Sequence, residues 1–164
     1  ITRNPSLMSE YQGDWYYEQL ELGFNYRITD IQCALGISQM NKLDKFIERR
    51  KQIAAKYNQA FSECQGIVIP YQQDGSNNSW HLYVIQVISK DRKVVFDTLR
   101  EKNIGVNVHY IPVYKQPYYQ KHGYSHINCP NAENIYKHII SLPIYVGLTD
   151  KEQNYVIQQV KEII

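Results

Sequence analysis

The sequence has no apolar run that approaches the roughly 20 residues needed to cross a bilayer. Its first residues, ITRNP, lack the basic start and apolar core of a signal peptide. Charge of one sign is also missing, because 18 Lys and Arg face 16 Asp and Glu, for a net charge of +2. We therefore expect neither a membrane nor a nucleic acid as a partner.

Cysteine is scarce, with three residues in the chain, Cys33, Cys64 and Cys129. Their odd number and wide spacing exclude a disulfide framework and favour a reducing compartment, so we expect a cytoplasmic protein. Cys33 lies in an apolar run, which is typical of a small core residue. The chain begins with Ile1 and not with Met, so we expect it to be a piece of a longer protein.

Several motifs that carry chemistry are absent. There is no Gly-rich phosphate loop and no G-x-S-x-G elbow. His122, His126 and Cys129 have metal-like spacing, but a structural zinc site needs four ligands and a fourth is not evident. We interpret this stretch as a surface loop and expect no metal. The basic cluster within residues 48–51 is interpreted as a solvated helix face.

The patterns that are present predict one α+β domain, since 164 residues that are 43% hydrophobic can bury a core. Capping boxes at Thr29 and Thr149 each start a helix. Asp91 can cap another, for which Gly105 is the expected C-terminal cap. The predicted helices are 29–40, 42–63, 91–103, 131–140 and one from 149 to the C-terminus.

About three short strands, most simply antiparallel, are predicted between these helices, at 67–70, 81–88 and 106–110. The helices would cover the resulting sheet. The helix from Thr29 has a broad apolar surface, because Ile37 and Met40 widen the stripe formed by Ile31 and Leu35. We therefore expect this helix to be well buried.

Two stretches combine polar and aromatic side chains. GFNYRITDIQCALG (residues 23–36) places Asn25, Tyr26 and Arg27 just ahead of a capped helix. VHYIPVY (residues 108–114) leads His109 and Tyr110 into a loop stiffened by proline and rich in tyrosine. These residues either pack internally or form a wall for a small ligand. The residue types alone leave both interpretations open.

Both stretches, in this order, resemble the DegT/DnrJ/EryC1/StrS family of sugar aminotransferases, which are fold-type-I enzymes that use pyridoxal phosphate (PLP). The matching segments cover nearly the whole chain. They include ELGFNYRITDIQCALGISQMNKLDKFIERRKQIAAKY, VNVHYIPVYKQPYY and CPNAENIYKHIISLPIYVGLTDKE. The pattern is similar in particular to C4-aminotransferases that act on UDP-linked 4-keto-6-deoxy sugars, as in the pseudaminic acid route.

The resemblance implies that residues 1–164 are the small C-terminal domain. The large domain, with the lysine that forms the Schiff base, would lie upstream and is absent from this chain, so no lysine here is nominated as catalytic. Asn25 matches an asparagine that reaches the PLP phosphate of the other subunit. Arg27, His109, Tyr110 and Tyr145 match positions on the substrate side.

At Tyr114 this sequence departs from its relatives, which commonly have histidine there. The resemblance implies a homodimer that transfers an amino group, from a donor such as glutamate, to a nucleotide-linked keto sugar for surface glycan synthesis. The fragment alone would then be inactive. Two alternatives stay open: a dehydratase-type member of the family, with histidine in place of the upstream lysine, or a stand-alone binding or dimerisation module without catalysis.

Overall fold

A computed structural model describes all 164 residues, which form two compact units, residues 1–41 and residues 42–164. The first unit contains a single-turn 3-10 helix, η1 (Pro5–Leu7), and the helix α1 (Asp30–Met40). The second unit contains the sheet and the other helices. None of the helices combines the length and the apolar character needed to cross a membrane.

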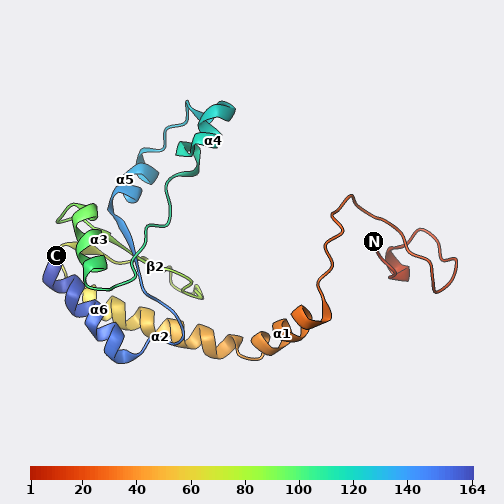
Figure 1. Cartoon of the computed structure of the whole chain (residues 1–164), viewed down its shortest axis with the longest axis horizontal. Coiled ribbons are helices and arrows are strands. Elements are labelled where there is room, and N and C mark those ends of the chain that lie inside the picture. The colour runs from red at the N-terminus through yellow and green to blue at the C-terminus, as the bar shows by residue number, and fades with distance from the viewer. The chain divides into compact units, whose positions relative to one another are not determined.

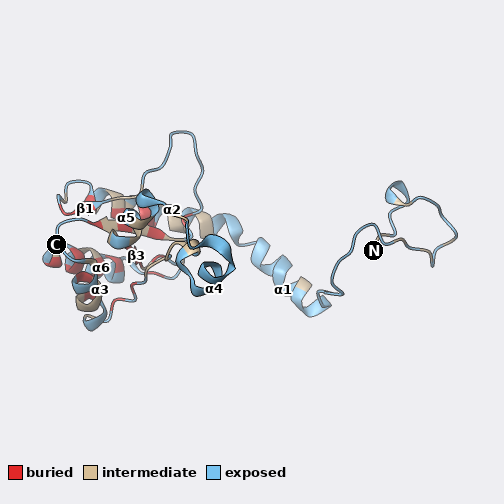
Figure 2. Cartoon of the chain, turned by 90° about the horizontal axis from the view of Figure 1, so that it is seen from above, coloured by how far each residue is buried: buried red, intermediate tan, exposed pale blue.

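Helix α1 begins where the sequence predicts, and its capping box is confirmed. The Thr29 hydroxyl accepts a hydrogen bond from the Gln32 N–H, and the Gln32 side chain accepts one from the Thr29 N–H. The expectation that α1 is buried is wrong for this chain. None of its residues is buried, Ile31 is 75% exposed, and Cys33 is only half-buried. Residues 1–41 supply no second layer that could cover the helix (Figure 2).

The second unit is built on a three-stranded antiparallel sheet, which confirms the predicted fold class. The strands are β1 (Ile67–Val68), β2 (Tyr83–Val87) and β3 (Ile139–Leu142), and their order is β1-β2-β3. Ile67 pairs with Val87, and Ile85 pairs with Ile140.

The third strand is not the predicted segment 106–110. From that segment only Asn107 pairs, in an isolated bridge to Ser141. The helix predicted over 131–140 ends at His138, and the β-branched pair Ile139 and Ile140 continues as β3 instead. The local sequence pattern favoured a helix at Ile139 and Ile140, but these residues pair with the free edge of β2 instead.

The helices of the second unit largely follow the prediction. They are α2 (Leu43–Phe61), α3 (Arg92–Glu101), α5 (Pro130–His138) and α6 (Asp150–Ile163). Between α3 and α5 lie the short turns η2 (Val113–Lys115), α4 (Pro117–Tyr119) and η3 (Gln120–Tyr124). These turns belong to residues 111–129, which we call the arm. Figure 1 shows the turns at the end of this arm, away from the sheet.

Two helix caps of this unit are as predicted and one is not. Asp91 caps α3, and Thr149 forms a capping box with Glu152 at the start of α6. The left-handed residue after α3 is Asn103, with φ of 59°, and not Gly105. Asparagine tolerates this conformation better than most non-glycine residues do.

The core lies on one face of the sheet, to which β2 and β3 send alternate side chains. Tyr57 of α2 packs against Tyr83 of β2, with ring centroids 4.9 Å apart, and stacks on Phe61. Helices α3 and α6 add further apolar side chains, and Figure 2 shows the buried residues gathered around the sheet, α2 and α6. The fully buried members include Ile53, Tyr57, Tyr83, Ile85, Val95, Leu99, Ile140 and Val160.

Candidate functional site

Asn25 and Arg27 lie together in the first unit, ahead of the capped start of α1. The Arg27 Nε–H donates to Asn25 Oδ1 over 3.2 Å. The Asn25 NH₂ group and the remaining guanidinium N–H groups make no hydrogen bond within the chain. Both residues line a shallow hollow, together with Tyr26, Ile28 and Gln32. The pair therefore presents several free N–H donors and a positive charge, which suits a negatively charged ligand.

His109 and Tyr110 lie in contact in the second unit, beyond the bridge between Asn107 and Ser141. Their rings meet edge to face, with centroids 4.7 Å apart. His109 Nδ1 lies 2.8 Å from the Ser141 Oγ, and Nε2 lies 3.1 Å from the Asn107 Nδ2. Tyr110 is 69% exposed. The histidine is thus fixed by its neighbours, while the tyrosine ring stands open to solvent.

Tyr114 is engaged within the chain. Its hydroxyl donates to Glu133 Oε1 over 2.8 Å and accepts from the Cys129 N–H over 3.3 Å. Glu133 also pairs with Lys115 over 2.5 Å, and the ammonium group, with help from Tyr114, lowers the pKa of this carboxyl. Partial burial and the hydrogen bond to Glu133 raise the pKa of Tyr114. Tyr114 therefore ties the start of the arm to α5.

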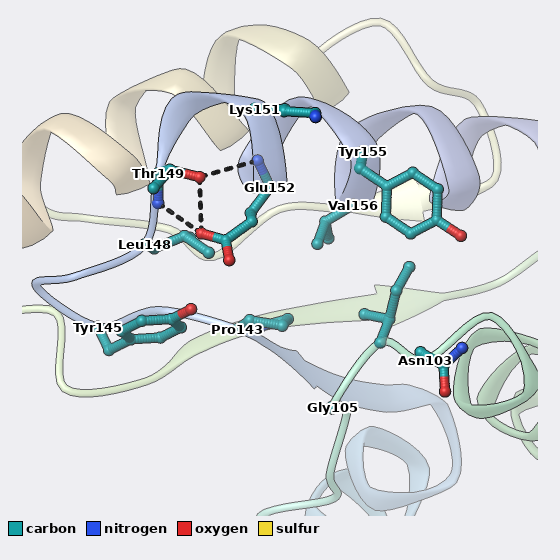
Figure 3. Close-up of a pocket in the computed structure, with 11 residues that line it drawn as sticks. Asn103, Gly105, Pro143, Tyr145, Leu148, Thr149, Lys151, Glu152, Tyr155 and Val156 are labelled. Atoms are coloured by element: carbon teal, nitrogen blue, oxygen red, sulfur yellow. Dashed lines mark hydrogen bonds between the residues drawn. The ribbon is translucent and has the colours of Figure 1, made fainter.

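Tyr145 lines a cavity of about 710 Å³ between the start of α6 and the segment after α3. Figure 3 shows Tyr145 and Tyr155 toward opposite ends of this cavity, with the Thr149–Glu152 capping box beside it. Tyr145 is 46% exposed. Neither His109 nor Tyr110 lines the cavity, so the structure does not bring Tyr145 together with them.

The segment that carries Tyr145 is held by arginines of α2. Arg50 Nη1 donates to the carbonyls of Ile144 and Trp80, each over 3.1 Å, and Arg49 Nη2 donates to the Leu148 carbonyl over 2.6 Å. The interpretation of residues 48–51 as a solvated face is therefore wrong for its two arginines. Their partners are backbone carbonyls about 30 to 99 residues away, which local patterns do not reveal.

The predicted surface loop around His122 carries no assembled metal site. His122 Nδ1 donates to the Tyr118 carbonyl over 2.7 Å, and its ring stacks on Tyr118 with centroids 4.1 Å apart. Nowhere does the structure group three or more His, Cys, Asp or Glu side chains so that they could hold a metal ion.

A comparison with known protein families shows to which family this chain belongs. The family model described as the DegT/DnrJ/EryC1/StrS aminotransferase family matches residues 2–161. The chain belongs to this family. The resemblance seen in the sequence is thereby confirmed, and Asn25, Arg27, His109, Tyr110 and Tyr145 all fall within the matched region.

Curated relatives of this family member include the spore coat polysaccharide biosynthesis protein SpsC of Bacillus subtilis. It is 40% identical over 158 residues, which cover 93% of this chain and 41% of the relative. The UDP-4-amino-4,6-dideoxy-N-acetyl-beta-L-altrosamine transaminase of Campylobacter jejuni is 34% identical, covering 87% of this chain and 38% of the relative. The chain thus spans about two fifths of the length of the relatives it matches.

Solved structures of aminotransferases are also similar to this chain. Helicobacter pylori PseC, an aminotransferase involved in the biosynthesis of pseudaminic acid, matches with a TM-score of 0.82 and 26% identity. That match covers 93% of this chain and 42% of the PseC chain. The PLP form of a Streptococcus pneumoniae protein described as a sugar aminotransferase matches with a TM-score of 0.81 and 28% identity, covering 93% and 40%.

The sequence analysis missed Asn107 and Ser141, the two residues whose side chains hold the ring of His109. The signal for Asn107 was available, because residues two apart on an extended strand share a face. Ser141 carried no such signal, since it lay just after the helix predicted over 131–140. Its role became visible only when β3 was in place.

Proposed function

We propose that this chain belongs to a PLP-dependent aminotransferase that transfers an amino group, from a donor such as glutamate, to a nucleotide-linked keto sugar. The observation that carries the proposal is the family match over residues 2–161. The names of the relatives support the substrate class, because one is a transaminase of a UDP-linked amino sugar and another acts in spore coat polysaccharide biosynthesis. The 4-amino-4,6-dideoxy sugar in the name of the Campylobacter jejuni relative supports amination at C4, and the description of PseC supports the pseudaminic acid route.

Residues 1–164 are the C-terminal part of this enzyme, and the large domain with the Schiff-base lysine is encoded upstream. The length of the relatives supports this division, because the chain spans only 41% of SpsC. The apolar residues of α1 also support it, since Ile31, Leu35 and Met40 are 60 to 75% exposed. A longer protein would have surface with which to cover them.

The amide donor of Asn25 fits the phosphate of PLP. Because Asn25 Oδ1 already accepts from Arg27, the amide presents its NH₂ group outward, and the guanidinium adds positive charge beside it. Asn25 would hold the phosphate, while PLP, when bound, supplies the electron sink of the reaction. In the proposed homodimer Asn25 does so for the site of the other subunit.

The remaining site residues bind the sugar nucleotide. Arg27 offers its free N–H groups to the diphosphate or a sugar oxygen. His109 and Tyr110 form a polar–aromatic wall, and Tyr145 supplies a second aromatic surface. The enzyme works in the cytoplasm, a proposal supported by three cysteines that form no disulfide.

Asn25→Ala in the longer protein tests the phosphate contact. A charge-assisted hydrogen bond contributes roughly 1.5–3 kcal/mol, so we expect PLP affinity to fall roughly ten- to hundredfold. The KM for the keto sugar should change less. Equilibrium dialysis against PLP measures the first quantity, and Asn128→Ala, at an exposed position of the second unit, is the matched control. Unchanged PLP affinity would remove the phosphate role from Asn25.

The 164-residue chain alone should neither form a stable visible absorption band with PLP nor transfer amino groups. The physical reason is that the proposed lysine lies outside it. Transamination by this chain alone would overturn the proposed division of the enzyme.

A further inference from the structure

The side chains of Asn107, His109 and Ser141 form a compact polar group in the second unit, beside the bridge between Asn107 and Ser141. The Ser141 N–H donates to the Asn107 carbonyl over 2.8 Å, and the Asn107 N–H donates back over 3.2 Å. Directly opposed residues share a face of a sheet, so the side chains of Asn107 and Ser141 lie on the same side. Both side chains contact the ring of His109. Ser141 is only 4% exposed, because Val84 of β2 pairs with it on the other edge.

The orientation of the Asn107 amide is set by its own backbone neighbourhood. Its Oδ1 accepts a hydrogen bond from the Val108 N–H over 2.8 Å. A flipped amide would place NH₂ against N–H at that distance, which is repulsive. The Nδ2 group must therefore be the one that faces His109 Nε2, at 3.1 Å.

This orientation decides where the imidazole carries its proton. An amide NH₂ only donates, so Nε2 must offer its lone pair and carry no hydrogen. Nδ1 must then be protonated, because a ring with neither hydrogen would be an anion. It donates to the Ser141 Oγ over 2.8 Å. A doubly protonated ring would set the Nε2–H against the Asn107 NH₂, two donors facing each other.

We propose that Asn107 and Ser141 are positioning residues that hold His109 as the neutral Nδ1–H tautomer with both ring nitrogens engaged. The second ring nitrogen fixes the tautomer here through its own hydrogen bond. A bound ligand then meets the face and C–H edge of the imidazole, next to the exposed Tyr110 ring. His109 neither gives nor takes a proton in the reaction. The ligand contact rests on the proposed function, whereas the tautomer does not.

Nitrogen NMR of ¹⁵N-histidine-labelled protein tests the tautomer directly. The chain has five histidines, so His109→Gln in the same longer protein identifies the signal. At neutral pH we expect His109 to show a protonated Nδ1 and an unprotonated Nε2. If the spectrum of the wild-type protein shows a ring protonated on Nε2, alone or together with Nδ1, the proposal is overturned.

Two substitutions test the assigned partners. Asn107→Asp keeps the acceptor for the Val108 N–H but replaces the donor that faces Nε2 with a carboxylate oxygen. We expect the Nε2 signal to become that of a protonated nitrogen. Asn154→Asp, an exposed position on α6, adds the same charge and should leave the signal unchanged. Ser141→Ala removes the acceptor of the Nδ1–H, so we expect the Nδ1–H signal to shift while Nδ1 stays protonated, and Ser141→Thr, which keeps the hydroxyl, should restore the wild-type signal. An unchanged His109 signal in Asn107→Asp would overturn the role of Asn107.

Steady-state kinetics of the longer protein tests the ligand contact. In Asn107→Asp we expect KM for the keto sugar to rise roughly threefold or more while kcat stays within about twofold, the pattern of a lost ground-state contact. A fall in kcat of roughly tenfold at constant KM, or no change in either constant, would overturn the contact. If the protein transfers no amino group at all, the proposed function fails, and the NMR result still decides the tautomer.

Discussion

Tyr114 occupies a position where the family resemblance leads us to expect histidine, and its contacts show what the tyrosine does instead. The phenol is long enough to reach Glu133 and the Cys129 N–H at once, so one side chain joins the first turn of the arm to α5. Glu133 completes the link through Lys115. A residue that would otherwise be a candidate for chemistry thus has a structural role in this chain.

Tyr114→Phe removes both hydrogen bonds and keeps the ring. Because the hydroxyl is only partly buried, we expect the free energy of unfolding to fall by about 1 kcal/mol. Trypsin should cleave faster at Lys115 and Lys121 in the native protein, since the arm is held less firmly. Chemical denaturation and limited proteolysis measure these effects. Tyr118→Phe is the matched control, because the hydroxyl of Tyr118 makes no hydrogen bond in the chain. Equal effects of both substitutions would contradict the assigned link.

Residues were predictable from the sequence to different degrees. Thr29, Asp91 and Thr149 act within four residues of themselves, so their caps could be predicted. The proposed roles of five residues came from the family resemblance: Asn25, Arg27, His109, Tyr110 and Tyr145. Arg50 and Ser141 could not have been found, because their partners lie far along the chain.

Helix α6 illustrates how one local motif supports the core. Its capping box fixes the first turn, in which the Thr149 hydroxyl accepts from the Glu152 N–H and the Glu152 carboxylate accepts from the Thr149 hydroxyl and N–H. From that start the helix delivers Val156 and Val160 into the core. The chief cause of the lowered pKa of Glu152 is the hydrogen bond from Thr149.

Thr149→Ala should therefore destabilise the second unit and not only the helix end. Loss of an N-cap of this kind costs about 1 kcal/mol, with a range of about 0.5–2 kcal/mol. Because the folded state holds Glu152 at a lowered pKa, its stabilising contribution is present above the ordinary value of 4.5 and is lost as pH falls below it. The difference between wild type and variant should thus shrink between neutral pH and acid.

Urea denaturation at pH 7 and at about pH 4 measures this difference, with Thr149→Ser as the variant that keeps the hydroxyl. A cost that is independent of pH would show that Glu152 takes no part in the cap.

At the scale of elements, helices were predicted better than strands. The patterns of α1, α3 and α6 span ten or more residues and begin at side-chain caps, so the starts of these helices were recognised. Strand β3 has four residues, and its sequence, IISL, follows a helix without a turn signal. Its assignment depends on pairing with β2, which is a tertiary interaction. The segment 106–110 has equal strand propensity but only Asn107 finds a partner.

The whole chain joins two units that differ in how they are stabilised. Residues 42–164 enclose a continuous apolar core on one face of a sheet. Residues 1–41 contain no buried side chain, and apolar side chains on α1 and in the loop before it stand exposed, including Leu22 at 95% and Phe24 at 84%. A helix of 11 residues is marginal on its own, because its nucleation is costly and packing supplies most helical stability.

Amide hydrogen exchange should therefore divide the 164-residue chain at about residue 41. We expect the amides of residues 30–40 to exchange at most some tens of times more slowly than unprotected amides. The amides of β2, β3 and α6 should exchange only through global unfolding. In the longer protein, residues 30–40 should become protected, because the proposed upstream domain or partner subunit covers the apolar side chains of α1. Mass spectrometry of peptides from both proteins makes the comparison, and residues 92–101 of α3, whose core contacts lie within the second unit, serve as the internal control. Strong protection of α1 in the short chain would show that residues 1–41 are stabilised without further sequence, and equally weak protection in both proteins would remove the proposed cover.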